Sequence, residues 1–388
     1  MAGLLLDIEG AEVQHGCVGG DFALTPQAFL PVGNRGQGDH KWEGIAALGG
    51  CFYCGPCDAA EVLVIEPGAA GDGDRLHFIP LGPKGQQNAK WAGIAALGDR
   101  LYCCPYSAEE VLVIEPGATR KQDRIRFIPL GQGGQSNAKW TGSTKGQSNG
   151  KWWGMAALDG RIYCCPCDAA EVLVIEPGAN GEEDRLRFIP LGPKGEGTFK
   201  WAGVAALDGR LYCSPDRSAE VLVIEPGAVG EQDRLRFIPL GSTKSQGDGK
   251  WVGIAALGDR LYCCPFSATD VLVIEPSPDG GEDRIHFLSL GPTCQMGSKW
   301  TGITALRGRL YCSPYRSADV LVIDPTEGPF VWQAEAGRST RKWFGCAAHE
   351  PSGLVYCAPH SAETVLRIDP ARMAPSRLQL LAGLELGP

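Results

Sequence analysis

The sequence KWAGIAALGDRLYCCPYSAEEVLVIEP, from Lys90 to Pro116, occurs in nearly the same form seven times along the chain. The tryptophans that follow the seven lysines are separated by 49, 61, 49, 50, 49 and 43 residues. The longest spacing contains an insertion, residues 140–151, in which KWTG precedes KWWG, and subtracting its 12 residues from 61 restores 49. A repeat of this length is typical of propellers and solenoids. The copies start near residues 41, 90, 151, 200, 250, 299 and 342.

Each repeat has the pattern of four β-strands. GIAAL and RLYC are joined by a tight turn, and Asp159-Gly160 and Asp208-Gly209 are strong hairpin signals. VLVIEP is an apolar run rich in β-branched residues, which suits a strand buried on both faces. The fourth segment, DRLRFIPLG with Pro190, fits an exposed outer edge because proline cannot donate a ladder hydrogen bond. We therefore predict an all-β fold, a seven-bladed β-propeller of four-stranded antiparallel blades.

The whole chain, residues 1–388, is expected to form a single propeller domain. We expect residues 1–40 to close the ring, because Leu4–Gly10 and Gln27–Gly33 resemble the last two strands of a repeat. Residues 371–388 are expected to provide the outer strand of the last blade, through SRLQLLAGL, followed by a tail. The alternative is that the chain was cut from a longer array of repeats.

The segment DGRLYCSPDRSAEVLVIEP, which begins at Asp208, resembles the YVTN-type propeller repeat. The shared pattern is a glycine turn, a tyrosine-bearing strand, a polar loop and an apolar strand that ends in an acid, with Tyr212 nine residues before Val221. The chain departs from that pattern in the cysteine after the tyrosine, in a proline where asparagine is common, and in the added Lys-Trp pair. The resemblance implies a propeller but leaves function open, since such propellers include surface-layer modules, lactonase-like enzymes and redox-associated proteins.

Composition and charge exclude several classes of protein. The net charge of −9 and the pI near 5.3 argue against nucleic-acid binding, which requires a basic surface. No apolar run approaches the roughly 18 residues of a membrane-spanning helix. The start, MAGLLLDIEG, lacks the basic segment of a signal peptide. We expect a soluble, monomeric protein in an intracellular, reducing compartment, most simply the cytoplasm.

Sixteen cysteines are present, and seven of them occupy one repeat position. Equivalent positions on adjacent blades are about 10 Å apart, too far for a disulfide, so we expect small buried side chains between blades. CFYCGPC offers a weak alternative, a thiolate metal site at Cys51, Cys54 and Cys57. His40 and His360 lie far apart in sequence and predict no metal triad. We therefore expect no cofactor.

The lysine of each Lys-Trp pair is a candidate ligand group. If GIAAL is the innermost strand, the seven lysines ring the mouth of the axial channel and would attract an anion. The structural alternative is that each tryptophan wedges between blades while the lysine covers an aromatic face or pairs with an acid. The ring consists of Lys41, Lys90, Lys151, Lys200, Lys250, Lys299 and Lys342.

Residues that break the repeat are where a specific function is expected, because shared residues mainly maintain the scaffold. One such feature is the polar insertion at 140–151. The others form a candidate partner-binding patch on one face: Trp153, Asp216, Arg217, Tyr315, Arg316 and His360. By contrast, the Asp-Arg pairs that begin five outer strands, from Asp74-Arg75 to Asp283-Arg284, are expected to be solvated turn charges.

The sequence favours a non-enzymatic binding or scaffold propeller that presents one face to another protein or to a small anionic ligand. No nucleophile triad, phosphate loop or paired-carboxylate motif is present to indicate an enzyme. Two alternatives remain open. One is a lactonase-like enzyme with a metal at the channel mouth, which would need inward-facing acids or histidines from several blades. The other is a carbohydrate-binding propeller, which would need exposed tryptophans.

Overall fold

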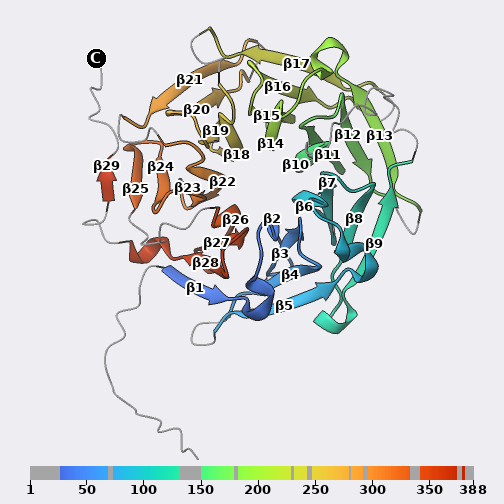
Figure 1. Ribbon diagram of the computed structural model, residues 1–388. Coiled ribbons are helices and arrows are strands. Elements are labelled where there is room, and N and C mark those ends of the chain that lie inside the picture. Colours follow the sequence, from blue (N-terminus) through green and yellow to red (C-terminus); the bar gives the residue numbers. More distant parts are fainter. Residues whose placement is uncertain are drawn as a thin grey trace, which may run out of the picture.

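The computed structural model describes residues 27–68, 73–131, 150–178, 182–228, 231–242, 247–278, 281–291, 296–332, 341–373 and 378–380. Seven antiparallel sheets are arranged in a ring around a central axis, as predicted (Figure 1). The described residues include no α-helix, only short 3-10 turns, so none of their helices is long and apolar enough to cross a membrane.

Each of the first five blades is built from four consecutive strands, with the Trp-bearing strand innermost. The strands are β2 (Trp42–Leu48), β3 (Cys51–Pro56), β4 (Glu61–Glu66), β5 (Arg75–Pro80), β6 (Trp91–Leu97), β7 (Arg100–Pro105), β8 (Glu110–Glu115), β9 (Arg124–Pro129), β10 (Trp152–Leu158), β11 (Arg161–Pro166), β12 (Glu171–Glu176), β13 (Arg185–Pro190), β14 (Trp201–Leu207), β15 (Arg210–Pro215), β16 (Glu220–Glu225), β17 (Arg234–Pro239), β18 (Trp251–Leu257), β19 (Arg260–Pro265), β20 (Asp270–Glu275) and β21 (Arg284–Ser289).

The last two blades use the chain ends. The sixth contains β22 (Trp300–Leu306), β23 (Arg309–Pro314), β24 (Val320–Asp324) and β25 (Gly328–Trp332), with β29 (Leu378–Leu380) as a fifth strand. The seventh contains β26 (Trp343–His349), β27 (Leu354–Pro359), β28 (Thr364–Ile368) and β1 (Gln27–Pro31). Short 3-10 helices follow some strands: η1 (Gly33–Gly36), η2 (Gly82–Gln86), η3 (Arg120–Gln122), η6 (Gly192–Gly195) and η8 (Pro370–Arg372).

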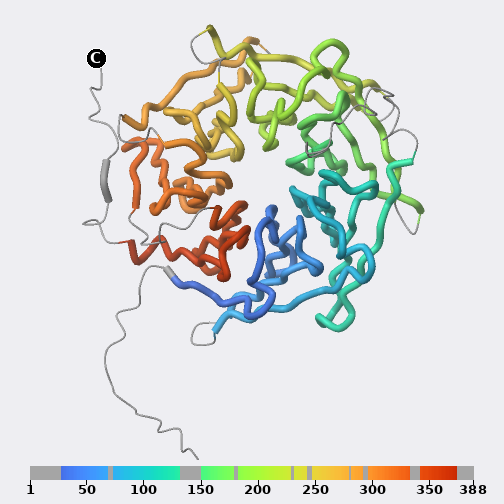
Figure 2. The backbone as a smooth tube through the Cα atoms, viewed as in Figure 1, coloured from blue at the N-terminus to red at the C-terminus, as the bar shows by residue number. Residues whose placement is uncertain are grey.

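The N-terminal strand completes the last blade. β1 pairs antiparallel with β28, from Gln27 opposite Ile368 to Pro31 opposite Thr364 (Figure 2). The C-terminal strand was expected in that place, but it pairs instead with β25 in the sixth blade, where Val331 lies opposite Gln379. The edge of β28 is already taken by β1, so the next free edge is that of β25. The Leu4–Gly10 segment lies outside the described residues.

Local sequence explains the hairpins and the buried strands. Asp159 and Gly160 have φ values of 49° and 71°, the positive values of the type I′ turn that the Asp-Gly pair predicts. The third strand of a blade is its most buried: Val111 to Ile114 of β8 are 0% exposed. The outer strands end in prolines such as Pro129 at the sheet edge, as expected.

The Trp and Gly of each Lys-Trp-x-Gly motif hold neighbouring blades together. The indole of Trp91 is 2% exposed, and its Nε1 donates a hydrogen bond of 2.8 Å to the backbone oxygen of Glu110. The glycine allows close approach, since a Cβ on Gly93 would lie 2.6 Å from the backbone oxygen of Trp153 on the next blade. The tryptophans therefore wedge between blades, which is the structural alternative given above.

A closed ring of backbone hydrogen bonds joins the seven blades at one mouth of the axial channel. The amide of Lys90 donates to the carbonyl of Cys57 on the preceding blade (3.0 Å), and the amide of Tyr106 then donates to the carbonyl of Lys90 (2.9 Å). The pattern repeats in every blade and closes where Lys41 donates to His360 (2.8 Å). We call this set of loops the rim.

The aspartates of the Asp-Arg pairs are buried, which corrects the expectation that they are solvated. The side chain of Asp233 is 0% exposed, and its Oδ1 accepts from the amide of Gly227 (2.9 Å). Arg187 Nη2 on the preceding blade forms an ion pair with Oδ2 at 2.7 Å. Asp184 and Asp283 form equivalent ion pairs with an arginine of the preceding blade. Only the arginine of each pair lies in solvent. The aspartates that anchor one blade to another are Asp74, Asp184, Asp233 and Asp283.

Candidate functional site

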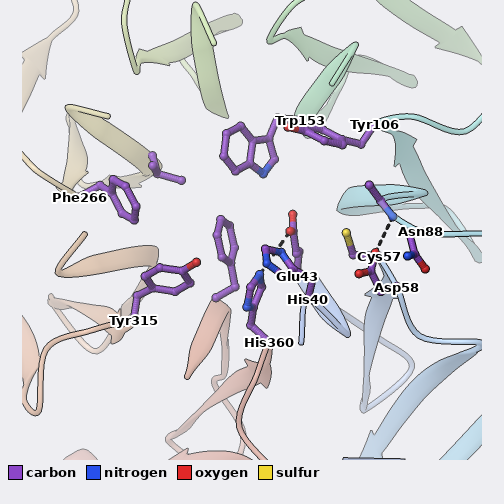
Figure 3. Close-up of a pocket in the computed structure, with 13 residues that line it drawn as sticks. His40, Glu43, Cys57, Asp58, Asn88, Tyr106, Trp153, Phe266, Tyr315 and His360 are labelled. Atoms are coloured by element: carbon purple, nitrogen blue, oxygen red, sulfur yellow. Dashed lines mark hydrogen bonds and ion pairs between the residues drawn. The ribbon is translucent and has the colours of Figure 1, made fainter. Parts of the chain in front are cut away.

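A cavity of about 360 Å³ lies at the rim, at the mouth of the axial channel (Figure 3). Most of its wall comes from three repeat positions that vary from blade to blade. These are the residue before each lysine, the residue after each Lys-Trp pair, and the residue after the proline of the second strand. The main lining residues are His40, Glu43, Cys57, Asp58, Tyr106, Trp153, Phe266, Tyr315, Phe344 and His360.

Aromatic side chains form a continuous belt across the mouth. Trp153 of the third blade stacks on Phe344 of the seventh, with ring centroids 5.9 Å apart and an interplanar angle of 23°. These two blades are not neighbours, so the stack crosses the axis. Tyr106 contacts Trp153 at 5.7 Å, Tyr315 contacts Phe344 at 5.8 Å, and Phe266 contacts Tyr315 at 5.7 Å.

Two histidines and a glutamate meet beside this belt. The rings of His40 and His360 are 4.3 Å apart, and His360 Nε2 lies 3.5 Å from Glu43 Oε1. His360 is 1% exposed and Glu43 8% exposed. Burial and the neighbouring His360 lower the pKa of His40. We call these three residues the His-Glu-His corner; in Figure 3 they lie together below Trp153.

The rim backbone positions the corner. His40 has a φ of 54°, a left-handed conformation that is unusual for a residue with a side chain. The equivalent Phe199, Ser298 and Arg341 adopt the same conformation, with φ from 53° to 60°. Glycine adopts this left-handed backbone with the least strain, yet the position carries side chains in these blades. Strained backbone of this kind is commonly associated with functional sites.

A second polar group lies next to the corner, where the amide of Asp58 donates to the carbonyl of His40 at 2.9 Å. Asp58 Oδ1 accepts a hydrogen bond of 2.5 Å from the amide of Ala89, which anchors the carboxylate to the next blade. Burial raises the pKa of the neighbouring Cys57 thiol well above its ordinary value, so Cys57 is a neutral thiol. This side of the cavity therefore offers a fixed acid and an apolar sulfur rather than a nucleophile.

The lysines of the candidate ring lie where they support the loops of the scaffold, away from the cavity. Six of them are between 1% and 5% exposed, and Lys151 is half-buried. Lys41 Nζ donates to the carbonyl of Gly38 at 2.7 Å, and Lys342 Nζ donates to that of Ser317 at 2.8 Å. Burial lowers the pKa of Lys90 and Lys151 to about 8. The ammonium groups hold the loops between blades, and none of the seven lines the cavity.

The candidate patch divides into two groups. Trp153, Tyr315 and His360 line the cavity together. Asp216 is buried beneath the rim, where desolvation raises its pKa to about 7. Arg217 lies over the ring of Phe199 at 4.8 Å, and Arg316 is exposed outside the cavity. Of the insertion at 140–151, only its last two residues are described.

The cysteine cluster does not converge. Cys51 and Cys54 lie along β3 and Cys57 follows its end, so the outer two are roughly 20 Å apart at about 3.3 Å per residue. All seven cysteines of the repeated position are 0% exposed, as expected for side chains packed between blades. Among the described residues, the group whose donor atoms are close enough for a metal is His40, Glu43 and His360. The sequence suggested no metal triad from these histidines, and the structure brings His40 and His360 together with Glu43.

Sequence reasoning missed most of the cavity wall, although a signal was present. Glu43 and Phe344 follow a repeated tryptophan, and their equivalents are Ala92, Trp153, Ala202, Val252 and Thr301. The residues on either side of this position, Trp and Gly, are the same in all seven copies. An alignment of the seven copies would therefore have shown that this position varies. Only Trp153 stood out, because it creates a visible Trp-Trp pair.

Comparison with known proteins supports the fold. No family model and no curated protein sequence matches the chain. Virginiamycin B lyase from Staphylococcus aureus is similar in structure, with a TM-score of 0.64, 15% identity, and coverage of 88% of this chain and 98% of that one. The β-propeller domain of Cps50 (Swd1) from Myceliophteria thermophila gives a TM-score of 0.54 at 9% identity, covering 88% and 99%.

A third similar structure is the extracellular domain of a protein described as a hybrid two component system from B. thetaiotaomicron. It has a TM-score of 0.57 and 12% identity, and the match covers 88% of this chain and 42% of that longer one. The three neighbours are a lyase, a propeller domain and the extracellular domain of a protein described as a two component system. Identities this low establish the shared fold and leave the activity open. The chain is therefore a seven-bladed β-propeller.

Proposed function

We propose that this protein is a binding propeller whose axial mouth takes up a planar ring, from a small molecule or from an aromatic side chain of a protein partner. The observation that carries the proposal is that residues which differ among blades converge on one cavity, whereas the repeated residues maintain the scaffold. A volume of about 360 Å³ falls within the roughly 300–1,000 Å³ common for small-molecule sites.

The lining of the cavity supports a ring-bearing ligand. Tyr106, Trp153 and Phe344 present aromatic faces and edges, which attract another ring in stacked or edge-to-face geometry. The His-Glu-His corner and Asp58 provide polar partners at the margin of the belt. An apolar wall with a few fixed polar groups is the common composition of specific ligand sites.

This proposal modifies the expectation of an anionic ligand. Six of the seven lysines that would have attracted an anion are buried, and none of the seven lines the cavity. The carbohydrate alternative required exposed repeated tryptophans, and those seven are 1% to 3% exposed. A YVTN-type origin of the repeat and an intracellular, reducing compartment remain part of the proposal.

A lactonase-like enzyme is the second candidate function. It required inward-facing acids and histidines from several blades, and Glu43, Asp58 and His360 meet that requirement from the first and last blades. The lyase among the similar structures shares only the fold at 15% identity. The binding role is preferred because the belt accounts for more of the cavity wall than the corner does.

Three indoles of different charge test the proposal: indole-3-acetate, 3-methylindole and tryptamine, each titrated by saturation-transfer NMR. We expect saturable binding that Trp153→Ala weakens about tenfold, as expected from loss of an aromatic contact. Phe29→Ala is the control, because Phe29 is an exposed aromatic on the outer strand β1. Absence of binding by all three indoles, or equal binding by Trp153→Ala, would contradict the proposal.

A further inference from the structure

We propose that His40, Glu43 and His360 bind one divalent transition-metal ion, such as Zn²⁺, at the junction of the first and last blades. The inference concerns the same cavity as the proposed function, but it does not depend on ring binding. It follows from the spacing, the orientation and the burial of the three side chains.

The spacing fits a coordination sphere. One donor atom from each residue lies within 4.8 Å of the other two. His360 Nε2 and Glu43 Oε1 are 3.5 Å apart. Donors at about 2.0–2.1 Å from a tetrahedral zinc are separated by roughly 3.3 Å, so these two atoms require little movement to share an ion.

The orientation of His360 is fixed by a second partner. Its Nδ1 lies 3.3 Å from the backbone oxygen of Arg341, to which an N–H at that position donates. The hydroxyl of Ser361 lies 3.1 Å from the same nitrogen. With Nδ1 directed at this carbonyl, Nε2 is the ring nitrogen that faces Glu43 and can coordinate an ion. Histidine ligands of metals commonly donate their other N–H in this way.

The ligands come from rigid backbone on two blades. Glu43 is the second residue of β2, and His360 directly follows β27. The amide of Lys41, adjacent to His40, donates to the carbonyl of His360 at 2.8 Å, the rim bond that closes the ring. A metal here would therefore connect the first and last blades, and its binding should raise the stability of the whole ring.

The positive charge of Arg341 would repel a metal ion at the corner. The inference can therefore be tested by variants expected to weaken metal binding and by one expected to strengthen it. Its Nη1 lies 3.0 Å from His40 Nε2, so a positive group already faces the corner. Arg341 is exposed and can turn into solvent, or His40 can offer its other nitrogen. Removing the guanidinium should strengthen metal binding, an effect that a purely structural role for the corner would not produce.

The site would leave a coordination position open to the cavity. Three protein ligands, two histidines and a carboxylate, leave a fourth tetrahedral position for water or for an oxygen of a ligand. A bound divalent ion would also supply the positive charge that the buried lysines do not offer to the cavity. An acidic group on the ring-bearing ligand would then be favoured.

The test is Co²⁺ and Zn²⁺ titration of chelator-treated full-length protein, followed by visible absorption, calorimetry and thermal melting. We expect one ion per chain, tetrahedral Co²⁺ bands and a metal-dependent rise in melting temperature. Glu43→Gln and His360→Ala should each weaken binding at least about 100-fold, the upper range for loss of supporting partners alone. Arg341→Gln should strengthen binding several-fold.

Two control variants separate this site from other metal sites. Asp58→Asn removes the acid next to His40, and Cys57→Ser removes the thiol that contacts Glu43; each should change the Co²⁺ affinity far less than loss of a ligand does. A sulfur-to-metal charge-transfer band that Cys57→Ser abolishes would overturn the assignment. Equal Co²⁺ affinity in wild type, Glu43→Gln and His360→Ala would also overturn it.

Failure here is distinguishable from failure of the proposed function. Trp153→Ala should weaken indole binding and leave Co²⁺ affinity unchanged, whereas Glu43→Gln should abolish Co²⁺ binding and leave 3-methylindole binding in place. Zn²⁺ should increase the affinity of the protein for indole-3-acetate more than its affinity for 3-methylindole. If Glu43→Gln melts at a lower temperature without metal, the Co²⁺ titration is carried out below its transition, so the affinity is still measured on folded protein.

Discussion

Trp152 and Trp153 are adjacent in sequence and have different roles. Trp152 is 2% exposed, and its Nε1 donates to the backbone oxygen of Glu171 at 2.8 Å, like its equivalents in the other blades. Trp153 is half-buried and stacks across the axis on Phe344. Since successive side chains of a strand point to opposite faces, one residue serves the scaffold and the next serves the cavity.

The same division applies to the whole Lys-Trp-x-Gly motif. The lysine holds a loop, the tryptophan wedges between blades and the glycine permits close approach of the next strand, as shown for Lys41, Trp91 and Gly93. The x position is not needed for these contacts, although Thr301 at this position donates to the backbone oxygen of Phe344 on the next blade. It is occupied by Glu43, Trp153, Val252 and Phe344 where it lines the cavity. A symmetric scaffold thereby carries an asymmetric site.

Replacing the two tryptophans gives the largest expected difference. Trp152→Ala removes a buried ring and should lower the free energy of unfolding by about 3–5 kcal/mol. Trp153→Ala removes a half-buried ring and should cost roughly 1 kcal/mol, mainly the lost aromatic contacts. Denaturant unfolding of the two variants measures the difference. Equal losses of stability would break the distinction between scaffold and site.

The buried aspartates give a second, smaller contrast within the scaffold. Arg187→Ala leaves Asp233 buried without its closest cation and should destabilise the fold by about 1–2 kcal/mol, allowing for the partial exposure of the arginine. Arg185→Ala, two residues away on the same strand, removes an exposed charge and should change stability by no more than about 0.5 kcal/mol. Thermal melting of the pair decides whether these aspartates are anchors or turn charges.

Asp216 should give the smallest effect, visible only as a pH dependence. Its pKa is raised to about 7 in the folded state, mainly by burial, against 3.8 for an exposed aspartate. Arg217 and Lys250 oppose this shift, and Asp248 adds to it. The folded protein binds the proton more tightly than the unfolded chain, so this group's contribution to stability is lost as pH rises from about 4 to about 7.

The variant Asp216→Asn should remove that part of the pH dependence. It should match wild type below about pH 4, where Asp216 is protonated in both the folded and the unfolded state, and be more stable by at least about 1–2 kcal/mol at pH 8. Asp248→Asn, at an exposed side chain, serves as the control and should leave most of the pH dependence in place. A wild-type profile that Asp216→Asn does not alter would show that this carboxyl titrates normally.

The fold was predictable because repetition amplifies weak signals. Asp159-Gly160 alone predicts only a hairpin, and Pro190 alone predicts only an edge position, but seven copies predict a ring. Ring closure was harder to assign, because β1 and the C-terminal strand have similar patterns. Pairing partners were decided by which edge was available, β28 for Gln27–Pro31 and β25 for Leu378–Leu380.

The candidate site was predictable only in part. Trp153, Tyr315 and His360 departed visibly from the repeat, and the structure brings them together. His40 and His360 are 320 residues apart in sequence, and only closure of the ring places their rings 4.3 Å apart. The lysines of the candidate ring do not line the cavity, and their repetition in every blade indicates a shared structural requirement.

The most direct test of the central claim is to soak crystals of the full chain with a set of aromatic fragments and locate every bound ring. The account predicts that the rings bind at the axial mouth, against Trp153 and Phe344, and that binding there is lost in crystals of Trp153→Ala. Rings found consistently elsewhere on the propeller, with the mouth empty at saturating fragment, would contradict it.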